Sequence, residues 1–481
     1  MQITARILSR NTSVLTASLL IQKILAFIYF SYLATQLGVS QTGLYFFSLS
    51  VVALFSVFID FGIINTVIRE VAKYPDKIHA YFSNTVIVRV ILSLVIYLVL
   101  IIIVFLTVTD LLTKIALLIA GLIMVIDSFT LLFYGFLRAR HNTVYEAVGN
   151  ILFQVILLIF GISVLMIRPE VLLALVALLI ASFTNLVYSL TRVVKLIKPQ
   201  FTWQINFPFV KEILLIALPF ALAGIFARGY GYLDTLLLRI LDDQIAVGYY
   251  SLPYKITFVW QFIPLAFIAS VYPAFSALFK TDKINLSKLF HKVVIYLLVI
   301  SLPLAIGLSL MAESIFINIY GLDYLPSAYA LQVLILCLPL LFINFPIGYL
   351  LNACNRQVQN TINIFIAMII SLICNIILIP HYSFIGAAYV SVVTTTLLFV
   401  LGFYYVLKII RIDWPWLLKK LIKLILSVAL MAAFILLIGN QINYLFVILF
   451  AAIIYLISIF AMHLITWSEI KYLYQSIIPN K

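Results

Sequence analysis

Long apolar stretches separated by short polar breaks run along the whole chain. A helix that spans a bilayer needs about 20 mostly apolar residues, because each residue adds about 1.5 Å and the hydrocarbon layer is roughly 30 Å thick. Division at polar, proline and glycine positions predicts fourteen such helices, at 11–36, 42–69, 83–108, 111–137, 144–167, 170–194, 211–239, 245–278, 285–311, 327–351, 359–379, 384–407, 416–439 and 442–466.

The composition supports an all-α integral membrane protein. Hydrophobic residues make up 65% of the 481 positions and charged residues only 10%. Soluble domains carry roughly 25% charged residues, so lipid must be the main solvent of this surface. The links between the predicted helices are short, and none is long enough to form a separate domain in water.

The charge distribution orients the predicted helices. The net charge is +14, and basic residues gather on the cytoplasmic loops of membrane proteins. With a cytoplasmic N-terminus, the predicted inner segments hold 23 of the 30 lysines and arginines, whereas the outer loops hold only Lys114, Arg168 and Arg239. One missed helix would reverse every later loop, so the asymmetry favours fourteen helices with both termini cytoplasmic. It also accounts for the positive charge without a nucleic-acid partner.

Metal, cofactor and catalytic chemistry have no signature in the sequence. The three cysteines and five histidines are scattered, without metal-ligand spacing or an H-E-x-x-H motif. A membrane glycosyltransferase or glycan polymerase would need a sizeable extramembrane loop with acid–base or metal-binding residues, and the sequence offers none. We therefore expect no catalytic residues, no metal and no cofactor.

Two loop sequences indicate an internal repeat. Residues 37–45 and 242–250 align at an offset of 205, which pairs Gly43 with Gly248 and Tyr45 with Tyr250. Six helices in each half make both halves enter from the same side, so the repeats should be parallel and related by an axis along the membrane normal. The predicted domains are a six-helix lobe at 1–200, a second at 201–410, and two additional helices at 411–481.

Two groups of residues carry a resemblance to a known family. They are Leu37-Gly38, Gly43, Tyr45, Asp60-Phe61-Gly62 and Arg69 near the front, and Leu350-Leu351-Asn352-Ala353, Arg356-Gln357, Asn375, Ile379-Pro380 and Gly386-Ala387-Ala388 further on. With this helix number and spacing, the chain resembles the polysaccharide flippase family. This is the Wzx-type (O-antigen) branch of the superfamily that also contains multidrug exporters and lipid II flippases.

The resemblance implies a fold like that of the multidrug exporters and a function in transport. Members of the family move undecaprenyl-diphosphate-linked oligosaccharides from the inner to the outer leaflet of the bacterial or archaeal cytoplasmic membrane. The implied partners are the lipid-linked oligosaccharide, membrane lipids and the glycan polymerase machinery. Alternating access would carry the substrate across.

Three cations lie deep in predicted helices. The offset of 205 also places Lys23 on Arg228, and Lys255 lies in the eighth helix. A charge at this depth costs roughly 2.5–3.5 kcal/mol on insertion scales, so it normally faces a cavity or a partner. We expect these side chains to bind an anionic headgroup in a central cavity between the halves. The alternative is an ion-paired packing role, with Asp60 or Asp234 as partner.

Other embedded charges suggest further roles. Arg89 lies near the predicted cytoplasmic face, where it could draw in the headgroup or simply snorkel to the interface. Asp60, Asp127 and Asp234 are candidates for coupling transport to a H⁺ or Na⁺ gradient, or they have packing roles.

The seventh predicted helix contains a candidate hinge. Pro219, Gly224 and Gly229 lie near Arg228, and proline removes a helix hydrogen bond while glycine adds freedom. A static kink is the alternative interpretation.

Three other kinds of transport protein remain open. A lipid II-type flippase would share the helix count and the cationic cavity. An ion-coupled multidrug exporter would share the two-lobed plan, but its cationic substrates favour acidic or aromatic pockets. A channel agrees less well with repeated halves and mid-membrane charges.

Overall fold

The computed structural model describes residues 5–439 and 441–464, and these residues are almost entirely helical, without a strand. The α-helices are α1 (Ala5–Asp60), α2 (Ile63–Lys73), α3 (Ile78–Thr107), α4 (Leu111–Ala139), α5 (Thr143–Ile167), α6 (Val171–Ile197), α7 (Phe207–Leu241), α8 (Gln244–Phe258), α9 (Phe262–Thr281), α10 (Lys283–Leu310), α11 (Ala312–Ile315), α12 (Leu325–Leu334), α13 (Cys337–Ala353), α14 (Gln357–Ile409), α15 (Trp414–Ile438) and α16 (Tyr444–Ala461). Short 3₁₀ or π turns occur at Pro75–Lys77, Val259–Gln261, Phe316–Tyr320 and Leu322–Tyr324.

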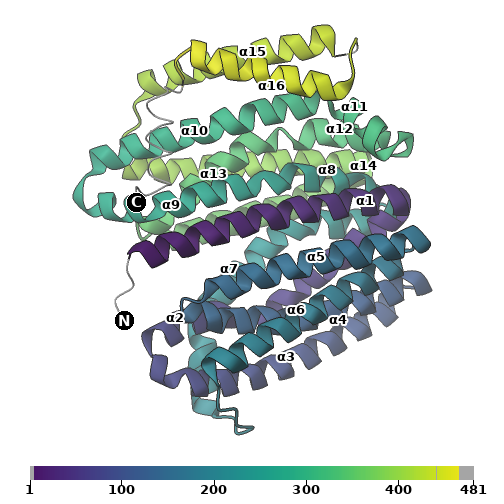
Figure 1. Cartoon of the computed structure of the whole chain (residues 1–481), viewed down its shortest axis with the longest axis vertical. Coiled ribbons are helices and arrows are strands. Elements are labelled where there is room, and N and C mark those ends of the chain that lie inside the picture. Colours follow the sequence, from purple (N-terminus) through teal and green to yellow (C-terminus); the bar gives the residue numbers. More distant parts are fainter. Residues whose placement is uncertain (1–4, 440, 465–481) are drawn as a thin grey trace. The chain divides into compact units, whose positions relative to one another are not determined.

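The chain divides into two compact units. The first contains residues 1–252 and 364–387, and the second contains residues 253–363 and 388–481. In the first unit α4 packs on α6, α1 packs on α5, and α7 packs on α1 (Figure 1). In the second unit α10 packs on α13 and α15, and α15 packs on α16. The repeat boundaries at 200 and 410 stay a prediction.

The helices have the lengths and surfaces of membrane spans. Eleven helical stretches in the described residues are long and apolar enough to cross a bilayer, or twelve if the pair 322–334 and 337–353, bent by 45°, forms one span. Large apolar side chains face outward, for example Leu106 at 80% and Leu437 at 73% exposure. Such a surface requires lipid around it. The protein is therefore a multi-pass membrane protein, and the all-α fold class is confirmed.

Two of these stretches are about twice the length that one crossing requires. Leu20–Lys73 has 54 residues and Gln357–Ile409 has 53, which would be roughly 80 Å each at 1.5 Å per residue. The first is interrupted at Gly38 (φ 69°) and the second at Ser383 (φ 52°). These breaks fall between predicted spans 11–36 and 42–69, and between 359–379 and 384–407. The total of fourteen and the cytoplasmic termini stay predictions, and residues 465–466 of the last predicted span lie outside the described residues.

The two loop sequences of the repeat touch each other inside the first unit. A Cβ atom on Gly43 would lie 2.0 Å from the carbonyl oxygen of Gln244, and one on Gly248 would lie 2.2 Å from that of Val39. The offset of 205 pairs Val39 with Gln244 and Gly43 with Gly248. Gly43 therefore approaches Gln244, while its counterpart Gly248 approaches Val39, the counterpart of Gln244. A local two-fold axis produces such a reciprocal pair of contacts. Only glycine allows backbones to approach this closely.

Candidate functional site

The Asp60-Phe61-Gly62 sequence breaks a helix that the apolar pattern predicts to be continuous over 42–69. Helix α1 ends at Asp60 and α2 begins at Ile63, because Phe61 (φ 44°) and Gly62 (φ 74°) adopt left-handed backbone conformations. A Cβ on Gly62 would lie 2.4 Å from the carbonyl oxygen of Ala217 in α7, so glycine is required for conformation and for packing. The Asp60 carboxylate accepts a hydrogen bond from the Ile64 N–H at 3.3 Å, which gives a partner to one N–H group in the first turn of α2.

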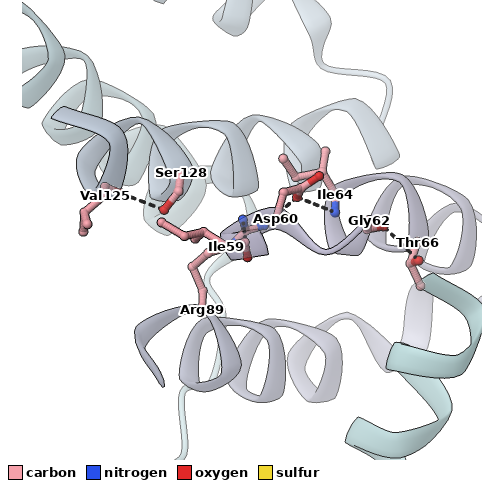
Figure 2. Close-up of polar contacts among 8 residues, drawn as sticks. All are labelled: Ile59, Asp60, Gly62, Ile64, Thr66, Arg89, Val125 and Ser128. Carbon is pink, nitrogen blue, oxygen red and sulfur yellow. Dashed lines mark hydrogen bonds and ion pairs between the residues drawn. The ribbon is translucent and has the colours of Figure 1, made fainter. Parts of the chain in front are cut away.

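Arg89 of α3 binds this break directly. Its Nη2 lies 3.0 Å from Oδ1 of Asp60, and its Nη1 donates to the Ile59 carbonyl oxygen at 3.1 Å (Figure 2). The Arg89 side chain is fully buried, whereas that of Asp60 is 32% exposed. Arg89 therefore does not snorkel to the interface, and Asp60 has the pairing role that the sequence left open, with Arg89 as its partner.

A cavity of about 310 Å³ adjoins this ion pair within the first unit. Its polar lining comes from α1, α3, α4 and α7, and consists of Ser56, Asp60, Arg89, Asp127, Ser128 and Arg228. The structure thus brings together four of the residues that the sequence singled out. Two guanidinium groups, two carboxylates and two hydroxyls around one small space can bind water, a small anion or a transferable proton.

Of the two arginines in the cavity wall, Arg228 makes fewer hydrogen bonds and ion pairs with the protein than Arg89 does. Its side chain is half-buried in α7, and its Nη1 donates a long hydrogen bond, 3.4 Å, to the Ala53 carbonyl oxygen. Among residues 5–439 and 441–464, no carboxylate lies within ion-pair distance of it. Most of its donor capacity is therefore free to bind an anion.

Asp127 is the carboxylate of the cavity without a cationic partner. It is half-buried in α4, and no ion pair forms at it in the described part of the chain. The next residue of α4 adds the hydroxyl of Ser128, which is already bonded to the Val125 carbonyl oxygen at 2.7 Å. An acid without a counter-charge in an apolar helix binds a proton or a cation readily.

Asp234 lies apart from this cavity, in a buried polar network of the first unit. Its Oδ1 accepts hydrogen bonds from Asn375 at 2.7 Å and Ser371 at 3.1 Å, and its Oδ2 accepts one from Tyr250 at 2.8 Å. The sequence suggested Asp234 as a partner for Arg228. Two residues six positions apart on a helix lie on different faces, so the two side chains do not meet in this way. Tyr250 and Asn375 are marked by the repeat and the family pattern, whereas no sequence signal identifies Ser371.

The other two predicted cations lie elsewhere. Lys23 of α1 is exposed and does not line the cavity. Lys255 of α8 is also exposed and belongs to the second unit. Their role in holding a headgroup stays a prediction.

The candidate hinge residues lie in one continuous helix, α7, with Pro219 in its interior. A Cβ on Gly229 would lie 2.5 Å from the sulfur of Met368, so this glycine serves close packing against α14. Gly224 has only an ordinary contact, 3.7 Å, with Val57. Bending at these positions stays a prediction.

The family of this chain follows from comparison with known proteins. Residues 8–279, more than half of the chain, match the family of polysaccharide biosynthesis proteins. The chain belongs to this family. The family resemblance found in the sequence is thereby confirmed.

Solved structures of two transporters share the fold. A lipid II flippase, MurJ, in an inward closed conformation superimposes with a TM-score of 0.77 at 17% identity, covering 96% of this chain and 99% of that one. An inward-facing multidrug resistance transporter of the MATE family and MOP superfamily gives a TM-score of 0.65 at 14% identity, covering 80% and 93%. The chain therefore shares the fold of these two transporters.

A sequence relative comes from an archaeon. An uncharacterized membrane protein of Methanocaldococcus jannaschii is 30% identical over 261 residues, which is 52% of this chain and 50% of that protein. The matched region thus spans about half the length of this curated relative.

Proposed function

We propose that this protein flips a lipid-diphosphate-linked oligosaccharide from the inner to the outer leaflet of the cytoplasmic membrane of a bacterium or archaeon, by alternating access. The observation that carries the proposal is Arg228, a half-buried membrane arginine that lines a cavity and has no carboxylate partner in the described residues. A guanidinium binds phosphate through two parallel hydrogen bonds. Membership of the polysaccharide biosynthesis family supports a glycan as the cargo.

The cavity of about 310 Å³ is too small for a whole lipid-linked oligosaccharide. In this proposal Arg228 holds a phosphate at one edge of a larger path. That Lys23 and Lys255 also bind the headgroup stays a prediction from the sequence. Arg89 acts differently, by fixing Asp60 and the break between α1 and α2. The product would pass to a glycan polymerase.

Replacing Arg228 by alanine is expected to lower the rate of substrate translocation about 30-fold, as for a lost charge contact of about 2 kcal/mol. Arg228→Lys should retain part of the activity, because lysine keeps the charge without the bidentate geometry. The measurement follows a sugar-labelled lipid diphosphate in cells that lack the native protein. Lys211→Ala, which removes an exposed cation from the start of the same helix, is the control. Wild-type export by Arg228→Ala at normal membrane abundance would overturn the role.

We further propose that Asp127 couples transport to an ion gradient. Asp60 is neutralised by Arg89, and Asp234 accepts three hydrogen bonds, whereas Asp127 has no cationic partner in the described chain. Protonation or Na⁺ binding at Asp127 would change the net charge of the cavity beside Arg228. Asp60 and Asp234 remain weaker candidates for the same role.

In proteoliposomes with an imposed pH or Na⁺ gradient, wild-type transport is expected to respond to one of the two, and Asp127→Asn is expected to lose that response. Asparagine keeps the size of the side chain and removes its charge. Glu170→Gln, at an exposed position before α6, should respond as the wild type does. A gradient response that survives in Asp127→Asn would exclude this residue from coupling.

The same substrate assay separates the alternatives. Accumulation of lipid II in the inner leaflet of depleted cells would favour a lipid II-type flippase, whose solved fold is shared over nearly the full chain. If depleted cells became sensitive to cationic drugs but exported glycan normally, a multidrug exporter would be favoured.

A further inference from the structure

A second, larger cavity lies in the second unit, remote in sequence from Arg228. Its volume is about 1000 Å³. Its walls are the first turns of α10, the end of α14 and the start of α15. The mechanism proposed above makes no use of it.

The cavity wall is strongly positive. Its five cations are Lys283, Lys288, Lys292, Lys408 and Arg411, and its lining contains one carboxylate, that of Asp413. Across the described residues, no carboxylate lies within ion-pair distance of any of the five cations. The lining therefore keeps a net excess of positive charge.

Asp413 of the lining and Asp282, which precedes the first lining residue of α10, both act as helix caps. Asp413 caps α15 by accepting the Trp416 N–H at 3.2 Å. Asp282 caps α10 by accepting the N–H groups of Ile284 and Asn285, each at 3.0 Å. The Asn285 backbone hydrogen bond lowers the pKa of Asp282, so this carboxylate stays ionised as a cap. Both acids are thus engaged as helix caps, and neither forms an ion pair with a cation of the wall within the described residues.

The wall is held in place by contacts between the segments that form it. The Ser287 hydroxyl of α10 donates to the Arg411 carbonyl oxygen. His291 is only 4% exposed, and its ring centroid lies 6.0 Å from that of Trp416. Its Nε2 is a buried nitrogen without a hydrogen-bond partner in the described chain. Lys408 donates to the Tyr404 hydroxyl at 2.6 Å, which fixes one ammonium group at the rim.

The position of the cavity identifies the kind of anion. Helices α10, α14 and α15 each have the length and apolarity of a membrane span, and the cavity lies at their ends. Exposed Trp414 and half-buried Trp416 lie at the start of α15, as aromatic residues do at headgroup depth. The predicted orientation places this end at the cytoplasmic leaflet. Basic pockets between helices on that side bind anionic lipid headgroups.

We propose that this cavity binds the phosphate headgroup of an anionic phospholipid from the cytoplasmic leaflet, as a resident lipid distinct from the transported substrate. Lys288, Lys292 and Arg411 hold the phosphate, while the apolar side chains of Leu289 and Leu407 border the path of the acyl chains. A volume of about 1000 Å³ accommodates a headgroup rather than a single ion. The proposal is independent of which glycan the protein flips.

The test measures the thermal stability of the purified full-length protein in neutral detergent micelles during titration with phosphatidylglycerol, phosphatidylcholine or inorganic phosphate. Phosphatidylglycerol should raise the melting temperature in a saturable way, and the other two should not. In Lys288→Ala/Lys292→Ala/Arg411→Ala the midpoint concentration should rise on the order of a hundredfold, since each basic residue contributes about a fivefold factor. The control Lys195→Ala/Lys198→Ala/Lys211→Ala removes three exposed cations from the same predicted face, and should keep the wild-type midpoint.

Three results would overturn the proposal. An equal rise of the melting temperature with phosphatidylcholine would show that any phospholipid stabilises the protein, whatever its charge. A full shift with inorganic phosphate would identify a soluble anion as the ligand. An equal loss in both triple variants would reduce the effect to overall charge. The wild-type titrations decide the first two outcomes even if the variants fold poorly.

Discussion

Arg89→Ala is expected to lower the free energy of unfolding by about 3 kcal/mol, the low end of the range for one half of a buried ion pair. The low end applies because the Asp60 side chain is 32% exposed. Asp60→Asn should be similarly harmful, since it leaves the fully buried Arg89 guanidinium without its counter-charge. The Nε of Arg89 is already buried without a hydrogen-bond partner among the described residues. Loss of Asp60 would therefore leave a second part of the same guanidinium group unpaired.

A double-mutant cycle separates pairing from packing. Arg89→Ala/Asp60→Asn removes both charges and should cost clearly less than the sum of the two single changes. Arg69→Ala is a control, because Arg69 is 63% exposed in its 3.4 Å pair with Glu70. This substitution should cost less than about 1 kcal/mol. Thermal unfolding in detergent measures all four. Additive losses in the double variant would contradict a direct ion pair.

Gly43→Ala and Gly248→Ala are each expected to cost about 1–3 kcal/mol, because the added methyl group meets backbone atoms that cannot rotate away. The new Cβ atom would lie 2.0 Å from the carbonyl oxygen of Gln244 in the first variant, and 2.2 Å from that of Val39 in the second. Gly231→Ala provides a matched control in α7, since its Cβ would have nothing within 4 Å. That change should be neutral or slightly stabilising.

The two glycine changes should be less than additive in combination, since one separation of the two loops relieves both clashes. This follows from the reciprocal contact between the repeats. Melting temperatures of the single and double variants provide the measurement. A loss confined to one glycine, or a fully additive loss, would contradict a local two-fold relation at this contact.

Much of the fold can be predicted from the sequence. Spans 83–108, 111–137, 144–167 and 170–194 correspond to α3–α6 within five residues at each end, because long apolar runs leave few other structures available in lipid. Gly43 and Gly248 indicate the repeat, although they do not reveal the direct contact between the two loops. The break at Phe61 and Gly62 escapes prediction, because apolar periodicity carries no information about the sign of φ.

The site is harder to predict than the helices. Arg89 and Asp60 are 29 positions apart, and the Asp234 network joins residues up to 141 positions apart. Such pairs depend on how helices pack, which a single sequence does not specify. The basic cavity of the second unit appears in the sequence only as part of the cytoplasmic charge excess. Ser287 and Arg411, which help to form it, are 124 positions apart along the chain.

The most direct test of the proposed function follows substrate between leaflets in reconstituted vesicles. Purified full-length protein and a lipid-diphosphate-linked oligosaccharide, labelled on its sugar, are incorporated together, and an impermeant glycosidase is added outside. We predict that the labelled glycan in the inner leaflet becomes cleavable at a rate that rises with the amount of protein and falls in Arg228→Ala. A rate equal to that of protein-free vesicles, with folded protein present, would contradict a flippase function.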